Sequence, residues 1–458
     1  MKNNFKKIII WISASVITLG ALIAVLVVKF TNPFKPAFYA YSSYTDQQTK
    51  NQIQKKYTYK EFGSYEEFEY AIGNNKAIAG ITSDYSIINL INEGKIAPIS
   101  KDLAEILGKP IDNLWNYFTD VTNEQMLAYD NLLTIDEVEY AAKYGYPENY
   151  DFKFRDFVVP YFINDRVIAF DTKKVLGHTY QAGEEINPLK ISSNADLSEC
   201  LKILKEKNNS IKIQWTKNPI ENVVYGSSYL SNGQYNGLDS FSTQINSSNY
   251  MEWIDNFATM VQVSTGGSIS NNGVNIFDSD SDIILNNLIN PSSKIDVAIL
   301  YNGDALDAYY GHDNFSAIDD GDRLRILRSQ NNIRILDAFV VSSSISHEKR
   351  KELLSFFNQY MFNNMFVTKS ELDAMNPETI YEQDGIMRIF DYVNYTPTAK
   401  GAFEYIRENY FILDPVTGKK DDVAIDIFNV VSGKAIMPVK QQLLSDLTLE
   451  FQKKLNGK

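Results

Sequence analysis

The chain is poor in the residue types that most often build covalent or metal-centred sites. Its 458 residues include one cysteine, Cys200, so an intrachain disulfide is excluded and stability has to come from packing. The three histidines, His178, His312 and His347, are scattered, and none stands at helical spacing from another ligand. A zinc site or a Ser-His-Asp triad is therefore not expected. We expect no catalytic residue, no metal, no cofactor and no enzymatic reaction. These absences do not by themselves exclude an enzyme, because carboxylate pairs could still do acid and base work, but no local pattern singles out such a pair.

Basic residues are also in short supply. The chain has 44 Lys and Arg against 57 Asp and Glu, a net charge of −13. Five of the basic residues and none of the acidic ones lie in the first 35 positions, which leaves the remainder with a net charge of −18. Such a field repels nucleic acid and attracts cations, although plain solubility explains it equally well. Gly266 and Gly267 lack the Lys and the spacing of a phosphate loop, so nucleotide binding is not expected either.

Long hydrophobic runs are rare, and the one that stands out is at the start of the chain. Residues 8–28 carry no charge and would span about 31 Å as a helix, which matches a bilayer core. Lys2, Lys6 and Lys7 precede this run, which favours an amino end that stays inside the cell. Its length favours an uncleaved signal anchor over a cleaved signal peptide. We expect residues 1–36 to form a cytoplasmic tip, a transmembrane helix and a tether, with everything after them outside the cell.

The remainder has the composition of a folded α/β protein. With 44% hydrophobic and 22% charged residues, the chain can fill two or three domain-sized units. Alternating patterns predict strands and helices in βαβ order, and hence a mainly parallel sheet. We expect residues 122–150 to be a surface insertion, and two strands to pass between lobes around residues 163–164. The expected strands are 37–41, 57–62, 76–81, 157–162, 167–170, 210–215 and 333–341; the expected helices include 64–73, 86–92, 135–144, 250–261, 348–362, 402–409 and 441–454.

One stretch, residues 294–311, combines a buried strand with the start of a helix. Apolar residues alternate up to Tyr301, Asn302 and Gly303 then break the strand, and Asp304 is well placed as an N-cap. Tyr301 thus lies at the carboxyl end of a strand, the end where open α/β sheets bind ligands. Most strand-turn-helix units carry no ligand, so the pattern alone does not establish a site.

Several short segments carry aromatic or acidic residues at expected strand ends. In chain order they are FYAYSSYTD (38–46), ITSDYSIINLINEGKI (81–96), VVPYFINDRVIAFDTKKV (158–175), WTKNPIENVV (215–224), VAILYNGDALDAYYG (297–311), LDAFVV (336–341) and NYTPTAKGA (394–402). Each resembles a ligand loop or hinge strand of the spermidine/putrescine-type ABC transporter substrate-binding proteins. The matches keep their order over most of the chain after residue 37.

This resemblance implies a fold, a function and a set of site residues. The fold would be of the type II periplasmic-binding-protein kind, with two α/β lobes on either side of a ligand cleft. Lobe 1 would hold residues 37–163 and 336–402, and lobe 2 residues 164–335 and 403–458. A monomeric binding unit would deliver a polyamine to ABC permease subunits driven by a cytoplasmic ATPase. The ligand-binding residues implied by the matched motifs are Tyr41, Ser42, Ser83, Tyr85, Asn218, Glu221, Tyr301, Asp337 and Tyr395.

The chemistry of these residues suits a polyamine. Putrescine and spermidine are methylene chains with ammonium groups, which need carboxylates at the charged ends and flat aromatic faces beside the chain. Glu221 and Asp337 supply two acids, and the tyrosines supply the faces. The sequence departs from the family pattern at Ser43, Asn218 and Ile335, where the family usually has two acids and a Trp. With fewer carboxylates, we expect a preference for a ligand with two amines over one with three.

Other readings stay open. A tyrosine at a strand end is often a core-edge residue, Asp337 could cap a turn, and Glu221 could sit in a first helical turn for dipole reasons. The same fold could bind a different small organic cation or an amino acid. It could also be a surface adhesion or structural protein built on a relict binding fold. A hydrolase is disfavoured because a nucleophile and its base are missing from the patterns.

Overall fold

The computed structural model describes residues 18–20, 35–63, 65–270, 273–311, 323–431 and 433–457. The expected anchor at 8–28 lies outside these ranges except for residues 18–20. Within the described ranges, none of the helices combines the length and the apolar character that crossing a bilayer requires.

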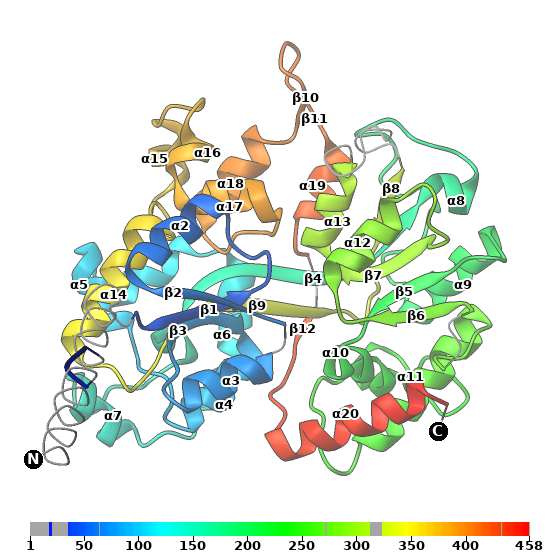
Figure 1. Cartoon of the computed structure of the whole chain (residues 1–458). Coiled ribbons are helices and arrows are strands. Elements are labelled where there is room, and N and C mark those ends of the chain that lie inside the picture. The colour runs from blue at the N-terminus through cyan, green and yellow to red at the C-terminus, as the bar shows by residue number, and fades with distance from the viewer. Residues whose placement is uncertain are drawn as a thin grey trace, which may run out of the picture.

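The described chain forms two α/β lobes side by side on one continuous sheet (Figure 1). The strand order is β2-β1-β3-β9-β4-β7-β5-β6, with β12 paired to β9 and β8 paired to β4. Lobe 1 carries β1 (Ala37–Tyr41), β2 (Thr58–Phe62) and β3 (Ala77–Ser83). Lobe 2 carries β5 (Ile213–Thr216), β6 (Asn275–Asp278), β7 (Val297–Tyr301) and β8 (Leu324–Leu327). β1 pairs parallel with both β2 and β3, and β5 pairs parallel with β6 and β7, as the βαβ pattern predicts.

Two antiparallel strands join the lobes. β4 (Val159–Asp171) pairs with β9 (Ile333–Val341) along its first half and with β7 along its second half. The expectation of two separate strands at 157–162 and 167–170 was wrong, because the polar residues between them stay in the ladder. Asp165 lies opposite Arg334 on β9, and Arg166 lies opposite Tyr301 on β7. Both ionic side chains are buried and paired with polar groups, which lets the strand continue through the crossing.

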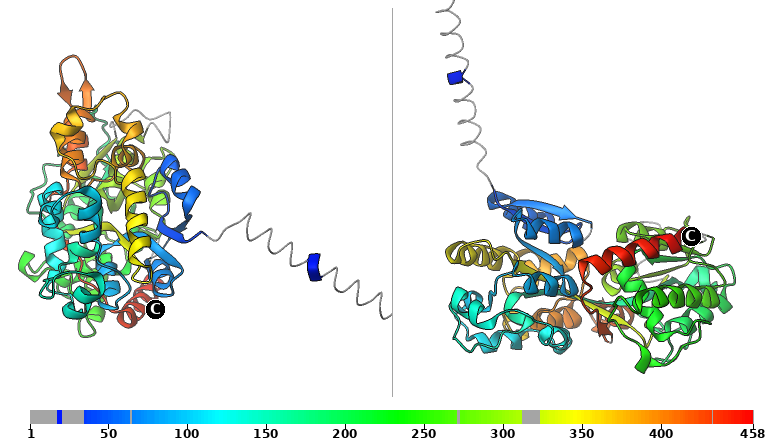
Figure 2. Two further views of the ribbon diagram at one scale, coloured as in Figure 1. Left: turned by 90° about the vertical axis from the view of Figure 1, so that its left-hand side faces the viewer. Right: turned by 90° about the horizontal axis from the view of Figure 1, so that it is seen from below.

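Helices cover the lobes on both faces of the sheet (Figure 2). On lobe 1 lie α2 (Gln47–Lys56), α3 (Tyr65–Gly73), α4 (Asp84–Asn92), α5 (Ser100–Leu107), α6 (Asp120–Asp130), α7 (Glu137–Tyr144), α14 (His347–Tyr360), α15 (Lys369–Asp373), α16 (Ile380–Gln383), α17 (Gly385–Val393) and α18 (Lys400–Asn409). On lobe 2 lie α8 (Thr172–Leu176), α9 (Leu197–Lys207), α10 (Pro219–Val223), α11 (Tyr250–Thr265), α12 (Ser281–Ile289), α13 (Asn302–Tyr309), α19 (Asp422–Phe428) and α20 (Gln441–Leu455).

Short elements complete the chain. They are the 3-10 turns η1 (Ile111–Tyr117), η2 (Phe154–Phe157), η3 (Val224–Ser228) and η4 (Leu238–Ser240), the hairpin β10 (Ile412–Asp414) and β11 (Lys419–Lys420), and β12 (Lys434–Ala435). α18 runs unbroken through the lobe boundary expected at residue 402 and packs against α15 and α17, so lobe 1 extends to the end of that helix. α20 returns to lobe 2 and packs on α10 and α11.

The segment 122–150 is not a surface insertion. Its first part continues α6, whose Gln125, Met126 and Tyr129 are buried. The Tyr129 hydroxyl donates to the carbonyl of Ile436 at 2.9 Å, and Gln125 Nε2 donates to Asp84 at 2.7 Å. The buried residues of α6 stand among polar residues, so the hydrophobic periodicity of this helix is weak. The sequence therefore did not reveal its buried face.

Candidate functional site

Asp337 on β9 is the centre of a buried polar cluster on the lobe 1 side. The antiparallel pairing of β3 with β9 places Ser83 directly opposite Asp337, and the Ser83 hydroxyl donates to Asp337 Oδ1 at 2.7 Å. The Tyr44 hydroxyl donates to Asp337 Oδ2, and the hydroxyls of Tyr41 and Ser83 lie 3.0 Å apart. Burial raises the pKa of Asp337, and the hydrogen bonds from Tyr44 and Ser83 partly oppose that rise.

The loop after β1 brings two tyrosine rings to this carboxyl. Ser43 adopts a left-handed conformation with φ 57°, which turns the chain sharply between Tyr41 and Tyr44. The two rings then meet edge to face with centroids 5.7 Å apart. Ser42, which the sequence placed in the site, is exposed in that turn. Tyr44, which the sequence left out of the site set, contacts Asp337 directly.

Glu221 forms the matching cluster on lobe 2. Asn218 caps α10 by accepting from the backbone N–H of Glu221 at 3.3 Å, and its side-chain Nδ2 donates to Glu221 Oε1 at 2.6 Å. The Tyr301 hydroxyl, at the end of β7, also donates to Oε1. Glu221 Oε2 is buried, and no donor among the described residues forms a hydrogen bond with it. A buried carboxylate oxygen without a donor is costly, so this atom is available to a cationic group.

Arg166 holds the Glu221 turn in place. Its Nη1 donates to the backbone carbonyl of Glu221 at 2.8 Å, and its Nη2 donates to Thr216 Oγ1 at 2.7 Å and to Asn222 Oδ1 at 2.8 Å. Burial raises the pKa of Glu221, and the positive charge of Arg166 works against that rise. No sequence motif assigns Arg166 to the site, because this residue lies inside a strand.

The two carboxyls act on the same space from different lobes. The charge of Asp337 raises the pKa of Glu221, and both carboxyls raise the pKa of the Tyr41 hydroxyl between them. Charges separated by the bulk of a lobe would not couple in this way. Glu221 and Asp337 therefore lie close enough for their charges to interact. We call these two carboxyls, together with Tyr41, Tyr44, Ser83, Asn218, Tyr301 and Tyr395, the interlobe site.

Tyr395 closes the interlobe site from the loop between α17 and α18. Asn394, left-handed with φ 58°, ends α17 and turns the chain so that the Tyr395 ring lies 5.3 Å from the ring of Tyr44. The Tyr395 hydroxyl donates to Asp304 Oδ1 on α13 at 2.6 Å. A Cβ on Gly303 would come within 2.0 Å of the Tyr395 ring, so the lobes approach closely here only because residue 303 is glycine.

The start of α13 differs from the expectation. Asp304 was expected to be the N-cap, but the helix begins at Asn302 with Tyr301 as N-cap. Asn302 instead uses its side chain between lobes, donating to Thr396 Oγ1 at 2.9 Å and accepting from the backbone N–H of Asp165. This shift of three residues places Asp304 in the first turn, where its carboxyl accepts from the Tyr395 hydroxyl.

Tyr85 reaches from α4 on lobe 1 into the core of lobe 2. It is buried and packs in one cluster with lobe 2 residues such as Ile299 and Tyr225. Its hydroxyl also raises the pKa of Tyr301, so it lies beside the Glu221 cluster. Of the nine residues in the sequence-based set, the structure gathers all but Ser42 around the two carboxyls.

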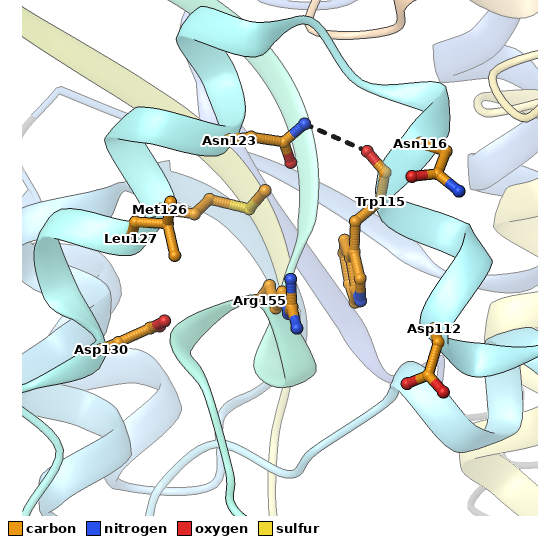
Figure 3. A pocket seen from close by; sticks show the side chains of 8 residues that line it. All are labelled: Asp112, Trp115, Asn116, Asn123, Met126, Leu127, Asp130 and Arg155. Atoms are coloured by element: carbon orange, nitrogen blue, oxygen red, sulfur yellow. Dashed lines mark hydrogen bonds between the residues drawn. The ribbon is translucent and has the colours of Figure 1, made fainter.

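A second hollow lies on lobe 1, away from the interlobe site (Figure 3). It measures about 190 Å³ and is lined by residues of η1, α6 and η2, with the Arg155 guanidinium 5.6 Å from the Trp115 ring. Asn123 Nδ2 donates to the carbonyl of Trp115 at 3.1 Å across its upper rim. The lining includes the carboxylates of Asp112 and Asp130 as well as the Arg155 guanidinium.

Comparisons with known proteins show the fold. A family described as hypothetical lipoprotein (MG045 family) matches residues 193–419, and no curated protein matches significantly. The TpPotD lipoprotein of Treponema pallidum is 10% identical, with a TM-score of 0.51 over 92% of this chain and 99% of that one. The GacH receptor of Streptomyces glaucescens is 13% identical, with a TM-score of 0.50 over 92% of this chain and 93% of that one. A tagatose-bound ABC transporter solute-binding protein of Thermotoga lettingae is 10% identical, with a TM-score of 0.50 over 92% and 94%.

These similarities establish a mixed α/β fold of the periplasmic-binding-protein kind, as the sequence motifs implied. At such low identity they say nothing about the ligand. The structures of this fold also come from proteins that bind quite different solutes, tagatose among them. The ligand has to be argued from the chemistry of the interlobe site.

Proposed function

We propose that the chain is the extracytoplasmic solute-binding component of an ABC importer and that it binds a polyamine, putrescine or spermidine, between its lobes. The observation that carries the proposal is the pair Glu221 and Asp337, two buried carboxyls from different lobes that act on one tyrosine-lined space. Asp337 accepts from the hydroxyls of Tyr44 and Ser83, and none of the described lysines or arginines forms an ion pair with it.

A slender dication fits this arrangement. An ammonium group at each end would neutralise one carboxylate, and Glu221 Oε2 has no donor of its own to compete with it. Asp337 already accepts two hydroxyl hydrogens, but an ionised carboxylate offers about four acceptor positions, so room remains for an ammonium donor. The rings of Tyr41, Tyr44 and Tyr395 supply apolar faces for the methylenes and cation-π contacts for the charged ends.

The remaining features of an importer component follow from the same proposal. Residues 1–36 would anchor the chain in the membrane through the apolar run 8–28, with the lobes outside the cell. The lobes, 37–163 with 336–409 and 164–335 with 410–458, would close on the ligand and present it as a monomeric unit to a permease with a cytoplasmic ATPase. The partial match to a lipoprotein family supports a membrane-associated, extracytoplasmic location.

Calorimetry tests the proposal directly. Titrating putrescine and spermidine into the purified protein at pH 8 should give a saturable heat with one site per chain. Glu221→Gln and Asp337→Asn should each weaken binding by about 30-fold or more, because each leaves one ammonium without its carboxylate, a loss of about 2 kcal/mol or more. Asp446→Asn on the exposed face of α20 is the matched control and should bind as the wild type does. Absence of heat with both polyamines contradicts the proposal.

One observation favours a second candidate, an amino acid. Arg166 Nε is buried beside the Glu221 turn, and within the described part of the chain it has no hydrogen-bond acceptor. An α-carboxylate is a natural acceptor for it. A ligand with both a carboxylate and an ammonium group could then span from Arg166 to Asp337. The same calorimetric series run with lysine and ornithine discriminates the two, since a site for diamines should bind these amino acids more weakly than putrescine.

A further inference from the structure

The hollow on lobe 1 contains a cation that the fold leaves without an anionic partner (Figure 3). Arg155, in the turn η2, is half-buried, and its guanidinium lies 5.6 Å from the ring of Trp115. None of the carboxylates and hydrogen-bond acceptors that the structure describes is paired with this guanidinium. A cation-π contact satisfies none of the five N–H donors, so Arg155 can still bind an anion in a bidentate way.

Asp130, at the end of α6, supplies the opposite charge close to Arg155. Its Oδ1 accepts from the backbone N–H of Phe154 at 2.9 Å, and no donor among the described residues is hydrogen-bonded to its Oδ2. Burial raises the pKa of Asp130, and the positive charge of Arg155 is among the effects that oppose this rise. The two side chains are therefore near enough for their charges to interact, yet they form no ion pair. A ligand that carries both charges would bridge them.

The lining of the hollow disfavours simpler ligands. A lone anion would meet the carboxylates of Asp112 and Asp130 on a chain with a net charge of −13, and a polyamine would be repelled by Arg155. A sugar or a base would need an open aromatic face to stack on. Trp115 does not offer one, because its ring already contacts Arg155 and Phe118 and only 6% of the residue is exposed.

An apolar part of a ligand would find a place beside these charges. Leu127 on α6 lines the hollow with 57% of its surface exposed, next to the buried Met126. Removing such apolar surface from water favours binding. The hollow measures about 190 Å³, and because a cavity of about 150 Å³ holds benzene, a molecule the size of leucine fits.

We propose that the hollow on lobe 1 is a binding site for a free α-amino acid with an apolar side chain, separate from the interlobe site. The α-carboxylate pairs with the Arg155 guanidinium, the ammonium group pairs with Asp130, and the side chain lies over Leu127. The ammonium and carboxylate groups of an α-amino acid are attached to one carbon, so they suit two protein charges that are neighbours without being paired. The site does not depend on what binds between the lobes.

Calorimetry on the purified protein with L-leucine as the probe tests this proposal. Leucine should bind saturably at one site per chain. Leucinamide, which lacks the carboxylate, and isocaproate, which lacks the ammonium group, should each bind about tenfold or more weakly than leucine. Arg155→Gln and Asp130→Asn should each weaken leucine binding by a similar factor. If leucine gives no heat, or if either analogue binds as tightly as leucine does, the proposal is wrong.

An exposed position keeps the test independent of folding. Leu127→Ser should weaken leucine binding about fivefold, whereas Val138→Ser, a matched change at a residue of α7 that is 60% exposed, should leave it unchanged. Equal leucine affinities of Leu127→Ser and the wild type would rule out the hollow. The variant Asp337→Asn separates the two sites, and it should bind leucine as the wild type does. If Asp337→Asn abolishes leucine binding and Arg155→Gln does not, the amino acid binds between the lobes and this inference falls, whatever the polyamine titrations give.

Discussion

Replacing Asp304 by asparagine should stabilise the ligand-free protein at alkaline pH. Burial raises the pKa of Asp304 from 3.8 to about 7, so the folded chain prefers the neutral carboxyl. The raised pKa favours the folded state fully below about pH 4, and this contribution is lost as the pH rises through about 7. Asparagine has nearly the same shape and never ionises, so it removes that loss while it can still accept the Tyr395 hydroxyl hydrogen.

The size of the effect follows from the pKa. One pKa unit corresponds to about 1.4 kcal/mol, so ionising Asp304 destabilises the folded chain by up to about 4 kcal/mol at pH 8 relative to pH 4. Relaxation around the charge reduces this figure, and we expect Asp304→Asn to be more stable than the wild type by about 2–4 kcal/mol at pH 8. At pH 4 the two proteins should agree within about 0.5 kcal/mol.

Urea unfolding followed by circular dichroism at pH 4, 6 and 8 measures this difference. The gap between the two midpoints should open between pH 4 and pH 8. Asp446→Asn, exposed on α20, should track the wild type at every pH. A gap of the same size at all three pH values would show that the side chain exchange, and not ionisation, sets the stability, and would refute the reasoning.

Three further predictions concern the contact between the lobes, the pH dependence of putrescine affinity, and a buried ion pair. Gly303→Ala would force a Cβ into the Tyr395 ring, so small-angle scattering should show a larger radius of gyration than for the wild type; equal radii would contradict the packing argument. Putrescine affinity should fall as the pH is lowered, and the fall should begin at a higher pH than an ordinary glutamate would give, because burial raises the pKa of Glu221 and a neutral acid does not attract an ammonium group; calorimetry showing no change of affinity with pH would argue against it. Asp102→Ala would leave the buried Arg350 guanidinium without its carboxylate at a cost of about 3–5 kcal/mol, and an unchanged urea midpoint would be the opposite result.

Much of the fold could be predicted from the sequence because its strands are strongly patterned. The strand expected at 333–341 is β9 residue for residue, and the helix expected at 441–454 differs from α20 by one residue. The crossing strand β4 was missed as one element, because its ionic residues looked like a break. Those residues are tolerated only because partners from lobe 2, distant in sequence, pair with them, and no local pattern shows such partners.

The residues of the candidate site could likewise be predicted only in part. Asp337, Glu221, Tyr41 and Tyr301 were assigned to the site because each lies in or next to a strand within a recognisable motif, whereas Tyr44, which donates to Asp337, was not assigned to it. Asp304 was predicted to be the N-cap of the helix, because a position after Asn302 and Gly303 fits an N-cap as well as a first turn. The hydrogen bond from Tyr395 to Asp304 joins segments about ninety residues apart in the sequence. Such contacts appear only once the chain has folded.

The most direct test of the central claim is a crystal structure of the protein grown with putrescine. The account predicts one diamine between the lobes, with one ammonium nitrogen about 3 Å from Glu221 Oε2 and the other within the same distance of an Asp337 oxygen. A diamine bound in the hollow beside Trp115, or between the lobes with neither carboxyl in contact, would contradict it.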